Sequence, residues 1–128
     1  MTGQGRQQKQ EGARGRGRGQ FVAYEVSLEI IRRLRPLLAT IGKHDRDLEK
    51  QGRRAASSIA LNLKEGNRRT GKDRAYHFTV AAGSADEVVG VLEISEAWEY
   101  LSEAATRPVL ALLDRQLALT WGLTHPRR

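Results

Sequence analysis

The chain has 128 residues, with 22 Lys and Arg against 15 Asp and Glu, a formal net charge of +7, and no cysteine. A chain of this length can bury one useful core, so we expect a single domain. The absence of cysteine excludes disulfide scaffolds, thiolate metal sites, iron–sulfur clusters and cysteine nucleophiles. Apolar runs are only a few residues long, and the N-terminus lacks the apolar segment of a signal peptide, so we expect a cytoplasmic protein.

The positive charge is unevenly distributed along the chain. Residues 1–20 carry a net +4 and residues 53–74 a net +5, whereas residues 75–128 hold four basic groups against seven acidic ones. Basic groups concentrated in two segments are typical of a protein that attracts a polyanion.

Residues 1–20 form a basic tail that ends in alternating Arg and Gly. The tail includes Arg14, Arg16 and Arg18 and holds six of the thirteen glycines. Such a segment buries too little apolar surface to offset the entropy of ordering, so we expect it to be disordered. Guanidinium groups contact phosphates and stack on bases, which makes the tail a candidate for binding single-stranded nucleic acid. A tail that only improves solubility is the alternative.

Helical periodicity begins at Phe21. Apolar residues recur every three or four positions and predict a first helix, which ends at a turn over Gly42 to Asp47. Asp45 or Asp47 is the expected N-cap of a second helix, which ends before Gly66. The expected core-facing residues are Phe21, Tyr24, Leu28, Ile31, Leu34, Leu38 and Ile41 in the first helix and Leu48, Gly52, Ala55, Ile59 and Asn62 with Leu63 in the second.

A third helix is predicted after a loop over Gly66 to Gly71. Thr70 and Asp73 fit a capping box at its start. Its two apolar stripes are Ala75, Phe78, Ala82, Ala85, Val89 and Leu92, and Val80, Ser84, Val91, Ile94 and Trp98.

A fourth helix begins at Ser102 or at Thr106, and the later start would place Pro108 in its first turn. Its two stripes are Leu110, Leu113, Leu117 and Trp121, and Val109, Leu112, Leu119 and Leu123. Four helices, short connections and no strand signal predict an all-α, up-down-up-down four-helix bundle over residues 21–124, followed by a basic tail at 125–128. Helices that are apolar on more than one side need more than one partner, so we expect self-association.

The string Gly66–Asp73 matches the G-x-x-x-x-G-K pattern of a nucleotide-binding P-loop. A P-loop needs Ser or Thr at the next position, where Asp73 stands, and a preceding buried strand, so we do not expect nucleotide hydrolysis. The basic residues around the start of the third helix are nevertheless candidate phosphate contacts, unless acidic neighbours pair with them. With two arginines of the second helix, the predicted nucleic-acid-binding residues of the body are Arg53, Arg54, Arg68, Arg69, Lys72 and Arg74.

Catalytic residues are not evident in the sequence. The histidines, His44, His77 and His125, lack metal-ligand spacing. Asp73 and His77 stand at i,i+4 and would form a general base if they paired, but such pairs are mostly structural. We therefore expect no catalytic, cofactor-binding or metal-binding residue and predict that the chain is not an enzyme.

Two motifs in the second and third helices resemble a known family. They follow the patterns S-I-x-x-N-x-x-E-G and G-S-x-x-E, and their residues are Ser58, Ile59, Asn62, Glu65, Gly66, Gly83, Ser84 and Glu87. The pattern resembles that of bacterial four-helix-bundle proteins whose reading frames lie within intervening sequences of 23S ribosomal RNA genes. The resemblance covers residues 21–124.

The resemblance implies an assembly and a class of partner. A relative of that family, the accessory variability determinant of diversity-generating retroelements, is a pentameric barrel that acts with a reverse transcriptase and its template RNA. By resemblance, we expect a ring or barrel-like homopentamer that binds nucleic acid, with no known enzymatic activity. The motif also fits a structural role, because Ser58, Asn62 and Glu65 share one helix face, and Gly83 with Ser84 would allow a close helix crossing where Asn62 or Glu65 finds hydrogen-bond partners.

These observations predict a non-enzymatic, oligomeric bundle that binds RNA or DNA phosphates without base specificity and needs no cofactor. The alternative is a protein-binding scaffold or adaptor for a co-encoded enzyme, such as a reverse transcriptase.

Overall fold

Four helices account for nearly all of the structure, a computed structural model that describes the backbone of residues 3–126 and the side chains of residues 22–126. The helices are α1 (Gly3–His44), α2 (Arg46–Asn67), α3 (Gly71–Ala97) and α4 (Glu103–Thr124). No strand occurs among residues 3–126. The predicted all-α fold is therefore confirmed.

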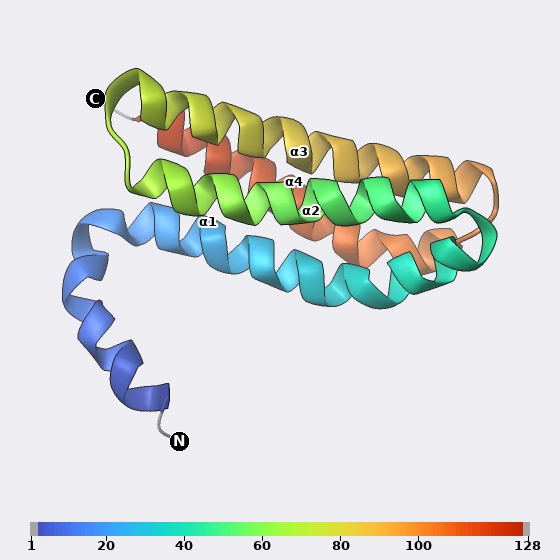
Figure 1. The fold of residues 1–128 in the computed structure, drawn as a ribbon, viewed down its shortest axis with the longest axis horizontal. Helices are drawn as coiled ribbons and strands as arrows, with labels where there is room; N and C mark the ends of the chain where they lie inside the picture. Colours follow the sequence, from blue (N-terminus) through green and yellow to red (C-terminus); the bar gives the residue numbers. More distant parts are fainter. Residues whose placement is uncertain (1–2, 127–128) are drawn as a thin grey trace.

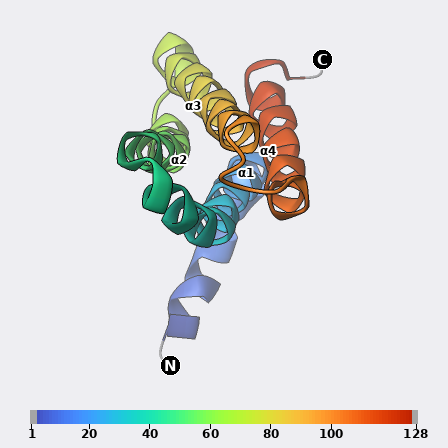
Figure 2. The same cartoon turned by 90° about the vertical axis from the view of Figure 1, so that its right-hand side faces the viewer.

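The helices follow one another around a four-sided bundle. Each helix packs against its neighbours in the order α1, α2, α3, α4 and back to α1. In Figure 1, α2 lies in front, between α1 and α3, and the end-on view of Figure 2 places α2 and α4 on opposite sides. The short connections reverse the chain each time, which gives the predicted up-down-up-down order.

At two of the three predicted helix starts, the N-cap side chain forms its capping hydrogen bond. Asp45 accepts a hydrogen bond from the backbone N–H of Leu48 at 2.9 Å and so caps α2. Ser102 accepts one from Ala105 at 3.1 Å, so α4 takes the earlier of its two predicted starts. Thr70 occupies the N-cap of α3, but its side chain makes no capping hydrogen bond, and the predicted capping box is not formed.

The core-facing stripe of α2 is as predicted. Leu48, Gly52, Ala55, Ile59 and Leu63 are all buried, and Asn62 is half-buried. A Cβ atom on Gly52 would lie only 2.7 Å from Cδ2 of Leu38 and 3.2 Å from Cγ1 of Val91. This glycine therefore lets α2 approach α1 and α3 closely, in exchange for a helix propensity about 1 kcal/mol below that of alanine.

The predicted stripe of α1 is correct only in its second half. Leu34, Leu38 and Ile41 are buried, but before them the core takes Ala23, Val26 and Ile30 in place of Tyr24, Leu28 and Ile31, which are partly exposed. The reason is packing against α4: the small Ala23 lies where the buried Gln116 donates a hydrogen bond to the Ala23 carbonyl at 3.1 Å.

The third and fourth helices bury a stripe that lies between their two predicted stripes. In α3 the fully buried residues include Ala81 and Val88, whereas Ala75 is exposed. In α4 three polar side chains, Thr106, Gln116 and Thr120, are fully buried, and Trp121 is 60% exposed. A single chain thus leaves a considerable apolar surface on α4 in contact with water.

The N-terminal part of α1 leaves the bundle (Figure 1). The backbone of α1 begins at Gly3, before the predicted start at Phe21. The side chains of residues 1–21 lie outside the described residues, as do residues 127–128, so the disorder expected of the basic tail stays a prediction. None of the helices in the described part of the chain is both long and apolar enough to cross a bilayer.

Candidate nucleic-acid interface

Five basic residues share the outward face of α2. Lys50, Arg53, Arg54, Lys64 and Arg68 include separations of 3, 4, 11, 14 and 18 residues, which are close to whole numbers of helical turns and place the five within one sector of the helix circumference. All five are exposed, and together with the exposed Ser57 and Leu61 they form what we call the α2 basic stripe. Its ends, Lys50 and Arg68, are 18 positions apart, or about 27 Å at the helical rise.

Three cations of the stripe are available to a ligand. Among residues 22–126, Lys50, Arg54 and Arg68 form no salt bridge. Arg53 Nη2 lies 2.8 Å from Oε2 of Glu49, and the Lys64 ammonium lies 4.8 Å from the ring centroid of Tyr24 on α1. Both of these contacts are at the surface, where phosphates could compete for the cation at little cost.

The connection between α2 and α3 is more neutral than its composition predicts. Arg69 hydrogen-bonds Glu65, and its Nη1 also lies 2.8 Å from Oδ2 of Asp73. The hydrogen bond from Arg69 lowers the pKa of Glu65, and both carboxylates raise the pKa of Arg69. For this arginine the structure favours the alternative interpretation, a cation paired with acidic neighbours.

The other two basic residues near the start of α3 differ from each other. Lys72 is exposed and forms no salt bridge among residues 22–126. The Arg74 guanidinium carbon lies 4.8 Å from the ring centroid of Phe78. Thus Arg54, Arg68 and Lys72 keep exposed charges without salt bridges, whereas Arg53, Arg69 and Arg74 already have partners inside the chain. The structure gives no side-chain positions for Arg14, Arg16 and Arg18.

The loop does not have the surroundings of a P-loop. The residues before it, from Ile59 to Asn67, belong to α2 and not to a strand. Gly71 adopts a φ of 60°, and the backbone turns there into α3.

The Asp73–His77 pair that would make a general base is not formed. Asp73 accepts from Arg69, while His77 Nδ1 lies 3.0 Å from Oδ1 of Asn62 on α2. Because an amide oxygen can only accept, the proton of His77 sits on Nδ1. No group of three or more His, Asp and Glu among the described residues is arranged to hold a metal ion.

The family motif forms a polar chain across the contact between α2 and α3. Ser84 Oγ donates to Ser58 Oγ at 2.7 Å, and Asn62 Nδ2 donates to the same oxygen at 3.1 Å. The chain of contacts then continues from Asn62 to His77. Asn62 was expected to find a partner on α3, and it does so at His77, whereas Glu65 is held by Arg69. The partner of Ser84 is Ser58, which was not expected.

Of the two motif glycines, only Gly66 lies at a close contact. A Cβ atom there would lie 2.6 Å from Cε1 of Phe78 and 3.1 Å from Cβ of His77. Gly83 is exposed, and a Cβ atom there would meet no atom of the described residues within 4 Å. The predicted close crossing at Gly83 is therefore wrong, and Gly66 provides it instead.

Sequence reasoning missed Lys50 and Lys64 as parts of the basic surface. The signal was present as spacing, because positions 50, 54, 57, 61, 64 and 68 follow the same three- and four-residue steps as an apolar stripe. The net charge of a segment does not reveal that its cations share a face.

Comparison with known proteins gives one match. The sequence model of a family described as 23S rRNA-intervening sequence protein matches residues 20–120. No curated protein and no solved structure has significant similarity to the chain.

Proposed function

The chain belongs to the 23S rRNA-intervening sequence protein family, and from that premise we propose that it is a non-enzymatic protein that binds RNA or DNA phosphates through the α2 basic stripe. The observation that supports this most is the row of exposed cations on one helix face, three of which lack a salt bridge among residues 22–126. Cations free of internal partners gain the full benefit of counterion release when they meet phosphates. The face reads no base edges in this proposal, so binding is independent of base sequence.

A non-enzymatic role fits the contacts of the groups considered as catalysts. His77 is held by Asn62 within the polar chain, and Asp73 is held by Arg69. Both side chains are therefore accounted for by packing between α2, α3 and their connection.

We also propose that the bundle acts as a homo-oligomer, and the family resemblance suggests a pentamer. The support is apolar surface that one chain leaves uncovered, including Trp121 at 60% and Ile94 at 46% exposure. Leucines on both sides of the buried stripe of α4 are also only partly covered, namely Leu112, Leu117, Leu119 and Leu123. Measurement of the mass in solution by light scattering tests this, and a monomer across the micromolar range would contradict it.

The nucleic-acid proposal is tested by the salt dependence of binding. Affinity for mixed-sequence single-stranded RNA and DNA is measured at several salt concentrations for the parent chain and for the triple variant Lys50→Gln/Arg54→Gln/Arg68→Gln. Each lost phosphate contact should flatten the slope of log affinity against log salt by about 0.7 on single strands, or about two units for the three.

A matched control removes the same charge from elsewhere. Arg32→Gln/Arg33→Gln/Arg115→Gln replaces three exposed arginines of α1 and α4 that lie outside the α2 basic stripe, two of which form salt bridges with Glu29 within α1. The control should keep the slope of the parent. Binding without salt dependence, or equal effects of the two triple variants, would refute the assignment to the stripe.

The contribution of the tail is measured separately with Arg14→Gln/Arg16→Gln/Arg18→Gln.

Co-purification from cells distinguishes the rival function, a scaffold for a co-encoded enzyme. Recovery that nuclease abolishes supports nucleic-acid binding, whereas nuclease-resistant recovery of a defined protein supports the scaffold.

A further inference from the structure

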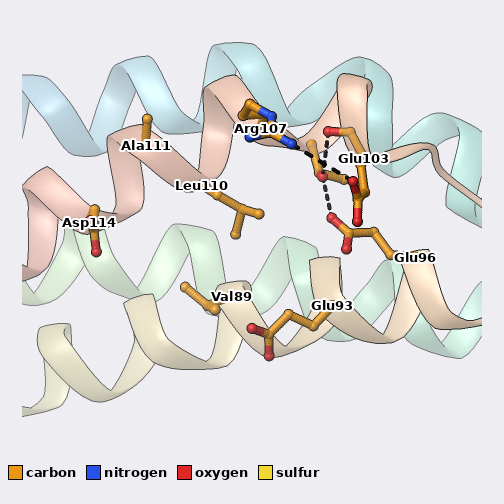
Figure 3. A pocket seen from close by; sticks show the side chains of 9 residues that line it. Val89, Glu93, Glu96, Glu103, Arg107, Leu110, Ala111 and Asp114 are labelled. Carbon is orange, nitrogen blue, oxygen red and sulfur yellow. Dashed lines mark hydrogen bonds and ion pairs between the residues drawn. The ribbon is translucent and has the colours of Figure 1, made fainter.

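A groove between α3 and α4 has an apolar floor and an acidic rim. It has a volume of about 490 Å³, and Val89, Leu110 and Ala111 contribute its apolar surface. Four carboxylates surround the floor, Glu93 and Glu96 from α3 and Glu103 and Asp114 from α4. Figure 3 shows Val89 and Leu110 between the two helices, with the acidic side chains around them.

The negative charge of the groove is largely uncompensated. Arg107 is the one cation among the lining residues, and its Nη2 lies 3.8 Å from Oε1 of Glu103. Glu96 hydrogen-bonds the hydroxyl of Thr106, which leaves its charge in place. Within residues 22–126, Glu93 and Asp114 form no salt bridge. Four carboxylates against one guanidinium give the groove a net charge of −3.

The surface around the groove has the same sign. Residues 75–126 contain seven acidic residues and two basic ones, Arg107 and Arg115. The α2 basic stripe lies on the helix that is opposite α4 in the bundle (Figure 2). The acidic surface of α3 and α4 therefore attracts a basic segment, and the α2 basic stripe repels one.

We propose that the α3–α4 groove binds the basic tail of the same chain, residues 1–20. Charge complementarity is the main argument, because the tail carries five basic groups against Glu11, a net +4, and the groove carries −3. The contact holds the tail away from the α2 basic stripe and competes with any anion that the tail could bind. It does not depend on whether the chain binds nucleic acid.

The tail is long enough to reach the groove. It joins the body at the start of the bundled part of α1, at the same end of the bundle as the last residue of α4, Thr124 (Figure 1). From Thr124, the groove extends back along α4 from Asp114 to Glu103, or about 15 to 32 Å at the helical rise. In the structure, residues 3–20 continue α1 away from the bundle (Figure 1), so the contact requires this part of α1 to unwind. Twenty extended residues then span up to about 66 Å. Gly17 and Gly19, next to the junction, allow the chain to turn back without a steric penalty.

The chain offers a direct test because it has no cysteine. A nitroxide spin label is attached to Gln10→Cys in the full chain, which leaves every tail charge in place, and amide signals are recorded by NMR at low salt. Signals of Leu110 and Ala111 should lose intensity, whereas those of Ser57 and Leu61 on α2 should keep theirs. The loss should disappear in 1 M salt, where screening shortens the Debye length to about 3 Å.

Charge variants locate the contact. Glu93→Gln/Asp114→Asn removes two exposed carboxylates of the rim and should restore the groove signals at low salt. Asp47→Asn/Glu87→Gln removes the same charge from exposed positions that do not line the groove and should leave the loss unchanged. The amide spectrum of each variant also reports whether the bundle stays folded.

Three results would overturn the proposal. The first is an absence of signal loss in the groove at low salt, and the second is equal loss on α2. The third is loss seen when spin-labelled chains without ¹⁵N are mixed with unlabelled ¹⁵N chains, because the tail would then come from another copy. The NMR samples contain no nucleic acid. A negative result would therefore refute the tail contact without bearing on the proposed function, and an absence of nucleic-acid binding would not bear on the tail contact.

Discussion

The replacement Gly66→Ala should destabilise the bundle, although alanine is the better helix former. Its Cβ atom would lie 2.6 Å from Cε1 and 2.9 Å from Cδ1 of Phe78, which is fully buried. Overpacking of this kind costs about 1–3 kcal/mol in well-packed cores. The propensity gain is at most about 1 kcal/mol, and it is smaller here because α2 ends one residue later, at Asn67. The steric term wins, and we expect a net loss of about 1–2 kcal/mol.

The matched control is Gly83→Ala, which changes the other motif glycine in the interior of α3. A Cβ atom there meets nothing within 4 Å among the described residues, so the propensity term stands alone and should stabilise the chain by about 0.5–1 kcal/mol. Urea unfolding followed by circular dichroism, at one fixed chain concentration, measures both free energies of unfolding. Equal or greater stability of Gly66→Ala than of the parent would show that the reasoning from steric contact is wrong.

Three further predictions concern caps, the polar chain and pH. Asp45→Ala should cost about 1 kcal/mol of unfolding free energy, whereas Thr70→Ala should cost clearly less because the Thr70 side chain makes no capping hydrogen bond; equal costs in urea unfolding would contradict this. Ser58→Ala should cost about 1–3 kcal/mol, because its hydroxyl accepts two side-chain hydrogen bonds across and along the helices, and a near-neutral result in the same assay would exclude an energetic role for the polar chain. Arg69→Gln should raise the pKa of Glu65 toward its ordinary value, as NMR titration of the carboxyl group will show; a Glu65 titration unchanged by the substitution would be evidence against the Arg69 contact. Since the pKa of Glu65 is lowered in the folded chain, its contribution to stability is present above the ordinary glutamate pKa and is lost as the pH falls through the lowered one.

The buried face of a helix could be predicted from the sequence where only one side of that helix contacts the core. The stripe of α2 was placed correctly because the cations of the α2 basic stripe occupy the opposite side of the helix, so only one orientation buries the apolar positions. The buried stripes of α1 and α4 were predicted less accurately. Ala23 and Gln116 carry little apolar signal, but they are buried because they fit each other at the contact between the two helices. Such complementarity depends on which helices are neighbours, and periodicity within one helix does not contain it.

The candidate site was predicted only in outline. The sequence identified the basic segment and three exposed cations, Arg54, Arg68 and Lys72. It could not distinguish these from Arg69, because a salt bridge depends on the side-chain positions around the turn. The acidic groove was not predicted at all, since its carboxylates come from two helices that are brought together only by folding.

The polar chain of Ser84, Ser58, Asn62 and His77 has a consequence for how the bundle is assembled. An interface made only of small apolar side chains tolerates sliding, because a shift of one helical turn, about 5.4 Å, brings similar surfaces into contact again. The same shift of α3 along α2 would separate Ser84 from Ser58 and His77 from Asn62 at once. Both hydrogen bonds between the helices would be lost, and the Ser84 hydroxyl, the His77 ring N–H and the Asn62 amide oxygen would lose these partners in a part-buried contact. These side chains thus select a single longitudinal register between α2 and α3, and with it the position of the connection that links the two helices.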